Sequence, residues 1–176
     1  MKNLKLFFSV SAIILSVIVC DMKAQAKNSN NVPEVVIASF NRKYPNAKVR
    51  RWNTKGDKFI AKAKINNSAC SVAFDKNGNW MSTMSNIRWT WKLPNAVLQA
   101  WSNTQYREWH VDFATKIENP EGEFYRIIAD DSNLQPDWDH QAVFTKYKAL
   151  MFKADGALAN VTDVTDGPIA YSESNR

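Results

Sequence analysis

The sequence predicts an α+β protein made of two tandem repeats, each a helix followed by a four-stranded antiparallel sheet. A helical pattern led by Pro occurs twice, at 32–44 and 93–101. Alternation of apolar and polar residues follows each helical pattern, as in strands with one buried face. A turn containing Gly then joins the last two predicted strands of each repeat, at Gly78 and at Gly156. The two repeats either share an interface or join into one continuous eight-stranded sheet with both helices on one face.

Residues 1–26 have the pattern of a secretory signal peptide. Lys2 and Lys5 precede an apolar stretch too short to span a bilayer, and Ala24-Gln25-Ala26 offers small residues to a signal peptidase. We therefore expect a periplasmic or secreted protein. A lipoprotein signal modified at Cys20 is the alternative, which the bulky Val19 disfavours, and a retained anchor is a third.

The composition is that of a globular protein, with 45% hydrophobic and 23% charged residues. Loss of the signal segment removes three lysines and one aspartate, which reduces the net charge from +6 to +4. So small an excess gives little reason to expect a nucleic-acid partner, and no membrane contact is expected beyond the signal or a lipid anchor. Cys70 would be the sole remaining thiol, and its alternation with Val72 and Phe74 predicts a buried, unreactive side chain.

The first repeat is assigned to residues 27–88. Its helix places four apolar residues on one face: Val36, Ile37, Phe40 and Tyr44. Four strands follow, at 47–54, 58–65, 69–75 and 80–87. In the second strand Phe59, Ala61 and Ala63 alternate with lysines, and Asn77-Gly78 between the last two strands predicts a tight hairpin because both residues tolerate positive φ.

The second repeat is assigned to residues 89–164. After the connector Arg88-Trp89-Thr90-Trp91, the pattern predicts a helix beginning at Leu93-Pro94, with Val97, Leu98 and Trp101 on one face. Strands are predicted at 106–117, 124–129, 143–152 and 158–164. This repeat contains an insertion at 130–141, and a polar, flexible tail is predicted at 165–176.

Several of these motifs resemble the PepSY-like family of exported bacterial proteins, which are built from tandem copies and are similar to the β-lactamase inhibitor protein. The resemblance rests on Val32-Pro33, Phe40, the bend 44–47 and the hairpin 74–80, and on their counterparts at 93–94 and 152–156. It implies a helix packed on a four-stranded sheet in each copy, with a concave sheet face available for a protein partner. Inhibition of a β-lactamase does not follow from fold alone.

The binding surface predicted from the pattern is the sheet face turned away from the helices. Aromatic, Met and Arg side chains on this face have the composition of an interface core. The residues assigned to it are Ile60, Lys62, Phe124, Arg126, Ile128, Tyr147 and Met151, together with Trp89 and Trp91 of the connector. The alternative is that the insertion, the tail or the other repeat covers this face, and that the two tryptophans pack between the repeats.

The acidic insertion is the densest group of oxygen ligands in the sequence. Asp137, Asp139 and His140 are its candidate ligands for a hard cation such as calcium. The spacing lacks the Gly and the terminal Glu of an EF-hand loop, so a solvated acidic loop is the simpler interpretation. We therefore predict no metal and no cofactor.

Catalysis is not expected from this sequence. His110 and His140 are its only candidate bases near neutral pH, and neither has a nucleophile motif or a phosphate-binding Gly loop beside it. An enzyme would need one of them in a pocket beside a carboxylate or hydroxyl. We predict a non-catalytic exported module that binds an extracytoplasmic protein or peptide; inhibition of an extracytoplasmic enzyme is one role that such a module can have. The alternative is an envelope protein that binds a small ligand or cation through the acidic insertion.

Overall fold

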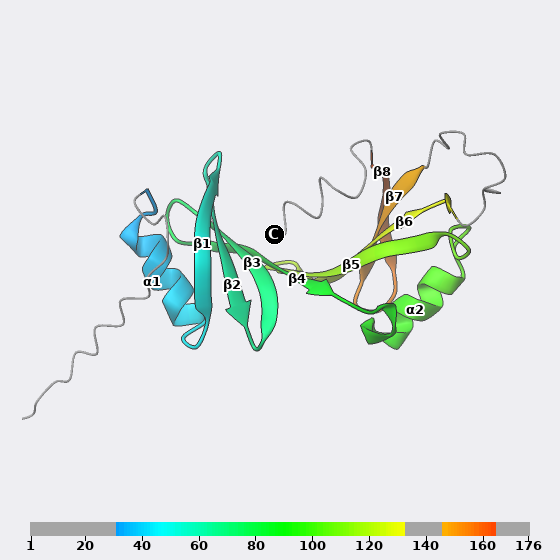
Figure 1. The fold of residues 1–176 in the computed structure, drawn as a ribbon, viewed down its shortest axis with the longest axis horizontal. Coiled ribbons are helices and arrows are strands. Elements are labelled where there is room, and N and C mark those ends of the chain that lie inside the picture. The colour runs from blue at the N-terminus through cyan, green and yellow to red at the C-terminus, as the bar shows by residue number, and fades with distance from the viewer. Residues whose placement is uncertain (1–30, 133–145, 165–176) are drawn as a thin grey trace, which may run out of the picture.

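The computed structural model describes residues 31–132 and 146–164, which form two helix-plus-sheet repeats. The first repeat consists of α1 (Glu34–Lys43), β1 (Lys48–Lys55), β2 (Lys58–Ile65), β3 (Ser68–Asp75) and β4 (Trp80–Ile87). A 3₁₀ turn, η1 (Thr90–Lys92), leads to α2 (Asn95–Ser102), β5 (His110–Asn119), β6 (Gly122–Asp130), β7 (Tyr147–Lys153) and β8 (Leu158–Asp163). The strands form one antiparallel sheet in sequential order from β1 to β8 (Figure 1).

Each helix starts directly after a Pro and packs its apolar stripe on its own four strands. In the first repeat Val36 and Phe40 of α1 are fully buried, and the Phe40 ring packs edge-on against Trp52 and Phe74. The strand side of this core consists of Trp52, Ala61, Ala63, Val72 and Phe74. A helix of ten residues has little stability alone in water, so this packing is what keeps it folded.

The second repeat has a separate core of the same design. Leu93 precedes α2 and Val97 lies within it, and both are buried against the sheet. The strand side consists of Ala114, Tyr125, Ile127, Leu150 and Phe152. All five of these strand residues are buried.

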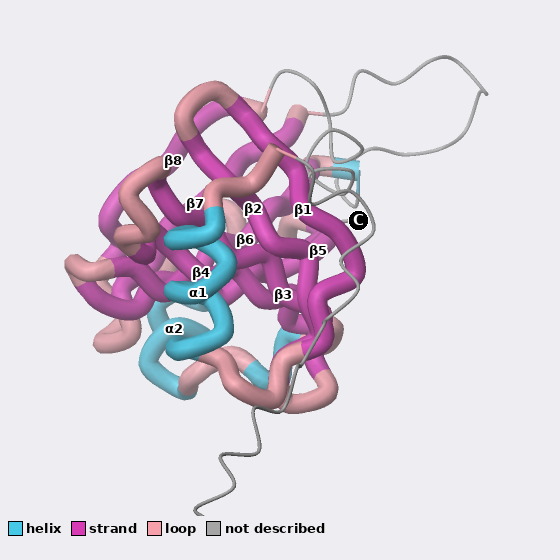
Figure 2. The backbone as a smooth tube through the Cα atoms, turned by 90° about the vertical axis from the view of Figure 1, so that its left-hand side faces the viewer, coloured by secondary structure: helices cyan, strands magenta, loops and turns pink. Residues whose placement is uncertain are grey.

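The pairing of β4 with β5 joins the two sheets into one. Thr83 lies opposite Glu118 and Ile87 opposite Ala114, with every residue between them paired in register. Residues directly opposite each other share a face, so the face under α1 continues into the face under α2. Both helices therefore cover the same side of the sheet, as Figure 2 also shows. The predicted continuous sheet, with helices on one face, is confirmed.

Two hairpin glycines contact the helices at equivalent positions. A Cβ on Gly78 would lie 2.9 Å from the Val35 carbonyl oxygen, and one on Gly156 would lie 2.6 Å from that of Ala96. Val35 and Ala96 are each the second residue of their helix. The last hairpin of each repeat is thus packed backbone to backbone against the start of its own helix.

One predicted boundary is wrong. Strand β5 begins at His110 rather than at 106, because 104–109 forms turns in which the Tyr106 ring packs edge-on against Trp109. The hairpin predicted at Asn77-Gly78 is confirmed. In this hairpin only Gly78 has a positive φ, and the Asp75 carboxylate accepts hydrogen bonds from the backbone N–H groups of Asn77 and Asn79. The signal segment, the tail and most of the insertion lie outside the described residues.

Replacing Gly156 tests the contact with α2. Gly156→Ala should lower the free energy of unfolding by about 3 kcal/mol, because φ is +90° and the new Cβ meets a backbone carbonyl. Gly56→Ala is the matched control: φ is +57°, nothing lies within 4 Å, and the expected loss is about 1 kcal/mol. Urea denaturation measures both, and equal losses would mean that the close approach contributes nothing.

Candidate functional site

We call the sheet surface opposite the helices the outer face. A row of side chains crosses it through the junction of the repeats, because successive strands pair Ser71 with Met84, Met84 with Ile117, and Ile117 with Phe124. The next row pairs Thr115 with Arg126, and Arg126 with Met151. The outer face therefore has apolar side chains and an arginine at its centre, and both helices of residues 31–132 and 146–164 lie on the other side.

The residues assigned to this face from the sequence differ in exposure. Ile60, Phe124, Arg126, Tyr147 and Met151 are half-buried. Trp89 and Trp91 are exposed, at 53% and 69%, so they do not form the packing between repeats that was the alternative. The guanidinium of Arg88 lies over the ring of Trp89, and the ammonium of Lys92 lies over the ring of Trp91.

Lys62 and Ile128 lie on the outer face but are buried. Ile128 has no exposed area and packs in a small cluster with Ala149 and Val164, so it offers no contact area of its own. Lys62 is 6% exposed, and its Nζ donates a hydrogen bond to Ser71 Oγ at 3.0 Å. Burial, followed by the charge of Arg51, lowers the pKa of Lys62.

A cavity of about 600 Å³ opens on the outer face at the junction of the repeats. It is bounded by the start of β3, the end of β4 and the bulged part of β5. Its charged lining comes from Arg88, Lys92 and Asp112, and Phe113 supplies an apolar wall. A cavity with both charges and one aromatic wall can hold a polar side chain of a partner or a small ligand.

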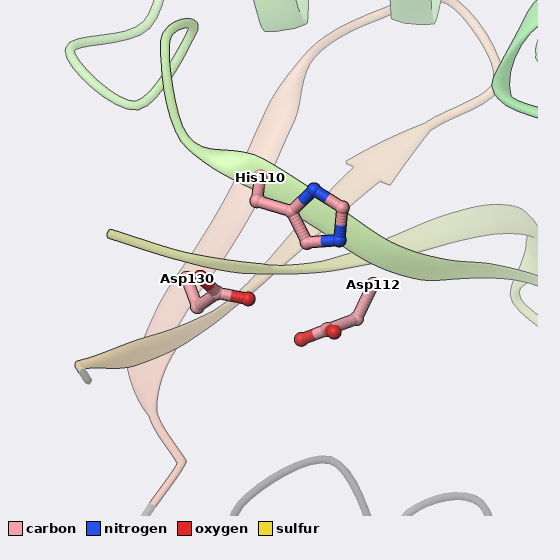
Figure 3. A group of neighbouring side chains, drawn as sticks. All are labelled: His110, Asp112 and Asp130. Carbon is pink, nitrogen blue, oxygen red and sulfur yellow. The ribbon is translucent and has the colours of Figure 1, made fainter. Parts of the chain in front are cut away.

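His110, Asp112 and Asp130 converge beside this cavity. Their ligand atoms all lie within 4.8 Å of one another (Figure 3). His110 and Asp130 face each other across the β5–β6 pair, and a bulge between Val111 and Phe113 adds Asp112 to the same group. One imidazole and two carboxylates can hold a divalent cation or exchange a proton.

The surroundings of Asp112 disfavour its ionised form. Burial, then the negative charge of Asp130 and a proton shared with it, raises the pKa of Asp112 to about 6. Two ionised carboxylates can only accept hydrogen bonds, so neither can donate one to the other. Asp112 Oδ2 is buried and has no hydrogen-bond donor among the described residues. Asp130 is 4% exposed, and its Oδ1 accepts a hydrogen bond from the Ser132 backbone N–H. Burial and the nearby carboxylates also raise the pKa of Tyr147.

Sequence analysis missed this cluster. His110 is exposed on the outer face and lies beside two carboxylates. The pattern His-x-Asp at 110–112, opposite an Asp at the end of the next strand, was the available signal. Asp137, Asp139 and His140, the ligands proposed from the sequence, lie outside the described residues.

Comparison with known proteins identifies the family. The family described as "Putative beta-lactamase-inhibitor-like, PepSY-like" matches residues 18–67 and 60–150. The chain belongs to this PepSY-like family. The resemblance seen in the sequence is thus confirmed. The first matched segment ends after β2, and the second runs from β2 of the first repeat into β7 of the second. None of the curated proteins matches the chain.

Solved structures from Bacteroides share the fold. A BLIP-like protein from Bacteroides fragilis is 26% identical, with a TM-score of 0.66 over 77% of this chain and 88% of that chain. A DUF2874 family protein from Bacteroides uniformis is 21% identical, with a TM-score of 0.66 over 78% and 94%. A structure from Bacteroides eggerthii titled "putative periplasmic proteins" is 18% identical, with a TM-score of 0.65 over 78% and 94%. In the described part of this chain, neither helix is long and apolar enough to cross a bilayer.

The raised pKa of Asp112 predicts a pH dependence of stability. The folded protein binds the Asp112 proton more tightly than the unfolded chain does, so protonation of Asp112 adds to the free energy of unfolding. This added stability is fully present below about pH 4 and is lost as the pH rises through about 6. The expected loss is on the order of 1–2 kcal/mol, reduced for solvent screening because Asp112 is partly exposed.

Asp112→Asn should remove this dependence and stabilise the protein at pH 7. Asp57→Asn, in the exposed β1–β2 turn, is the control and should leave the profile unchanged. Urea denaturation between pH 4 and 7 provides the comparison. An unchanged profile for Asp112→Asn would contradict the assignment.

Proposed function

We propose that this protein is a non-catalytic exported binding module that captures an extracytoplasmic protein or peptide on its outer face, as an inhibitor of an extracytoplasmic enzyme. The observation that carries the proposal is the placement of both helices on one side of a continuous sheet. That arrangement puts the row of Met84, Ile117 and Phe124 on the side away from both described helices, where Met84 and Phe124 are half-buried and Ile117 is buried. Membership of a beta-lactamase-inhibitor-like family supports the same use of the fold.

The composition and shape of the outer face support protein binding. Met, Phe and Arg side chains are enriched in interface cores, and Met84, Phe124 and Arg126 lie together here, half-buried. The adjacent cavity of about 600 Å³ gives a partner side chain a place to insert. Trp89 and Trp91 stand exposed on the connector between the repeats and add aromatic area.

Export is supported by the sequence of the first 26 residues and by the description of a similar structure as periplasmic. The absence of a catalytic role is proposed because no nucleophile motif accompanies either histidine. His110 does lie beside two carboxylates, and for that cluster a separate role in cation binding is tested below.

Site-specific crosslinking tests the proposed face. A photoreactive residue at Met84 should form one discrete adduct in envelope extracts, and the same residue at Gln99, exposed on α2, should not. Phe124→Arg should reduce the Met84 adduct about tenfold or more, because interface anchors carry most of the binding energy. Gln99→Arg is the matched control.

Thermal melting of each variant excludes a folding defect. The captured enzyme, once isolated, is then assayed with and without the protein. Equal adduct yields at Met84 and Gln99 would contradict binding on the outer face. So would a Met84 adduct whose yield is unchanged by Phe124→Arg. A partner whose activity is unchanged in the complex would contradict the inhibitory role.

Cation binding is a second candidate function, favoured by the convergence of His110, Asp112 and Asp130. Asp130 is almost fully buried, and Asp112 Oδ2 is buried without a hydrogen-bond donor, so a bound cation would satisfy both carboxylates. The mixed nitrogen and oxygen set suits a transition metal such as zinc or manganese better than calcium, which prefers oxygen ligands alone.

Metal titration separates this site from the acidic insertion. Calorimetry at pH 7 with zinc, manganese or calcium should give one site whose affinity falls about tenfold or more in Asp112→Asn. The double variant Asp137→Ala with Asp139→Ala should keep the affinity. Loss of binding in the double variant alone would assign the site to the insertion, and the absence of any binding would reject the function.

A further inference from the structure

The two edge strands of the sheet, β1 and β8, differ in chemistry. Strand β1 carries four exposed cations, Lys48, Arg50, Arg51 and Lys55, and charged side chains on an edge discourage pairing with another strand. Strand β8 has the sequence Leu-Ala-Asn-Val-Thr-Asp, with no Lys, Arg or Pro. Within residues 31–132 and 146–164 no strand lies beyond β8, so half of its backbone N–H and C=O groups point away from the sheet.

The first repeat shows that a strand of this design accepts a neighbour. Strand β4 is the counterpart of β8, because Trp80 lies opposite Phe74 as Leu158 lies opposite Phe152. After this pair each strand carries one extra, bulged residue. Beyond its bulge, β4 pairs with β5 over residues 83–87. The bulge on β8 is therefore no obstacle to a further strand.

The register of β4 identifies the stretch of β8 that corresponds to the paired stretch. Counting on from the Trp80 and Leu158 positions, Val161 corresponds to Thr83 and Asp163 to Ser85. In the first repeat Ser85 lies opposite Lys116 of β5. The segment 161–164 of β8 is thus the edge at which an antiparallel strand would pair.

The side chain at the start of this strand also differs between the repeats. Trp80 packs against the first core, with Lys43 Nζ 3.8 Å from its ring centroid. Its Nε1 donates a hydrogen bond to Thr83 Oγ1 at 2.9 Å. Its counterpart Leu158 is a smaller side chain and is 48% exposed. The second repeat therefore lacks the aromatic ring that covers the same position in the first.

A cavity of about 620 Å³ lies beside Leu158. Its apolar lining includes Ala100 of α2, Tyr106, Phe152 and Val161. Val161 packs against the second core, so its side chain points to the helix side of the sheet. A residue opposite Val161 on an added strand would point to that same side, toward the cavity. The cavity is large enough for an aromatic side chain.

We propose that the edge of β8 binds an extended segment of a partner protein by strand addition, with an aromatic side chain of that segment in the cavity. The segment runs antiparallel to β8 and pairs with 161–164, as β5 pairs with β4. A Lys two residues before the aromatic residue faces Asp163, whose side chain is 76% exposed. This surface is separate from the outer face, so the inference goes beyond the proposed function.

A second copy of the chain fits this site less well than a foreign segment. Of the two edges that a second copy offers, β1 carries the four cations described above. The other edge, β8, has no aromatic residue to place in the cavity. An aromatic residue in an extended segment of another protein satisfies both the backbone edge and the cavity.

Peptide binding tests the proposed edge. The probe is the fluorescein-labelled, amidated peptide Thr-Lys-Thr-Trp-Thr-Thr-Thr, and the readout is anisotropy with the full chain. Replacing the Trp of the peptide with Ala should weaken binding about tenfold or more, because the contact in the cavity is lost. N-methylation at peptide residues 3 and 5, or at 4 and 6, blocks the N–H groups of one strand edge or the other. One of these pairs should abolish binding and the other should retain it.

Two variants of the protein test the site from the other side. Leu158→Trp introduces the side chain that the first repeat has at this position and should weaken peptide binding about tenfold or more. Thr162→Lys adds a cation to the edge of β8 and should also weaken it. Thr54→Lys is the matched control, an exposed Thr on β1, and should leave the affinity unchanged. Thermal melting excludes a folding defect in each variant.

Other occupants of the edge would give different results. Self-association of the full chain that is lost in Leu158→Trp would assign the edge to a second copy and overturn the proposal. A tenfold gain in peptide affinity in the double variant Ile169→Asp with Tyr171→Asp would assign it to the end of this chain. Equal binding of the Trp and Ala peptides, equal loss with both methylated peptides, or no binding at all would also overturn it.

The outer face serves as an independent control. Phe124→Arg should leave the affinity for the peptide unchanged, because Phe124 lies on the side of the sheet away from the cavity. A tenfold loss in this variant would place the peptide on the outer face and overturn strand addition at β8. Crosslinking at Met84 that persists in Leu158→Trp would support two separate surfaces.

Discussion

The backbone pairing between β4 and β5 is the interaction on which the architecture depends. Each repeat builds a small core around one short helix. Among the described residues the two cores share no buried side chain, although Ile87 at the end of β4 packs against the second core. The five residue pairs from Thr83–Glu118 to Ile87–Ala114 fix both repeats in one register. A shift of one residue would turn the second helix to the opposite side, because side-chain direction alternates along a strand. The continuity of the outer face is therefore a consequence of this register.

Charge is distributed unevenly along that face. The first repeat presents exposed lysines on β1 and β2, among them Lys48, Lys58 and Lys64, whereas the second presents Asp112 and Asp130 at one end of β5 and β6. Between them lies the row of Met84, Ile117 and Phe124. A partner that spans the face would meet basic, apolar and acidic regions in turn, which fixes its orientation as well as its affinity.

Much of the fold could be predicted from the sequence because the repeats obey local rules. Alternation in 58–65 and the Pro before each helix depend only on neighbouring residues, and those predictions agree with β2, α1 and α2. The bulge at Asp112 and the turns before His110 depend on how β5 meets β6 and Trp109, which no local pattern records. The burial of Ile128 and Lys62 likewise involves residues distant in the sequence: Ile128 packs with Ala149 and Val164, and Lys62 donates a hydrogen bond to Ser71. The pattern placed both on the outer face but could not give their exposure.

The hairpin glycines define where this fold can change in length. The last hairpin of each repeat is held against a helix at Val35 or Ala96, so an added residue there would separate the layers. The turns at Gly56 and Gly122 have open space around them, and they connect neighbouring strands at the same end of the sheet. Foreign peptides or reporter groups can therefore be grafted at these two turns while both cores stay intact, which makes them the natural attachment points for a tethered probe.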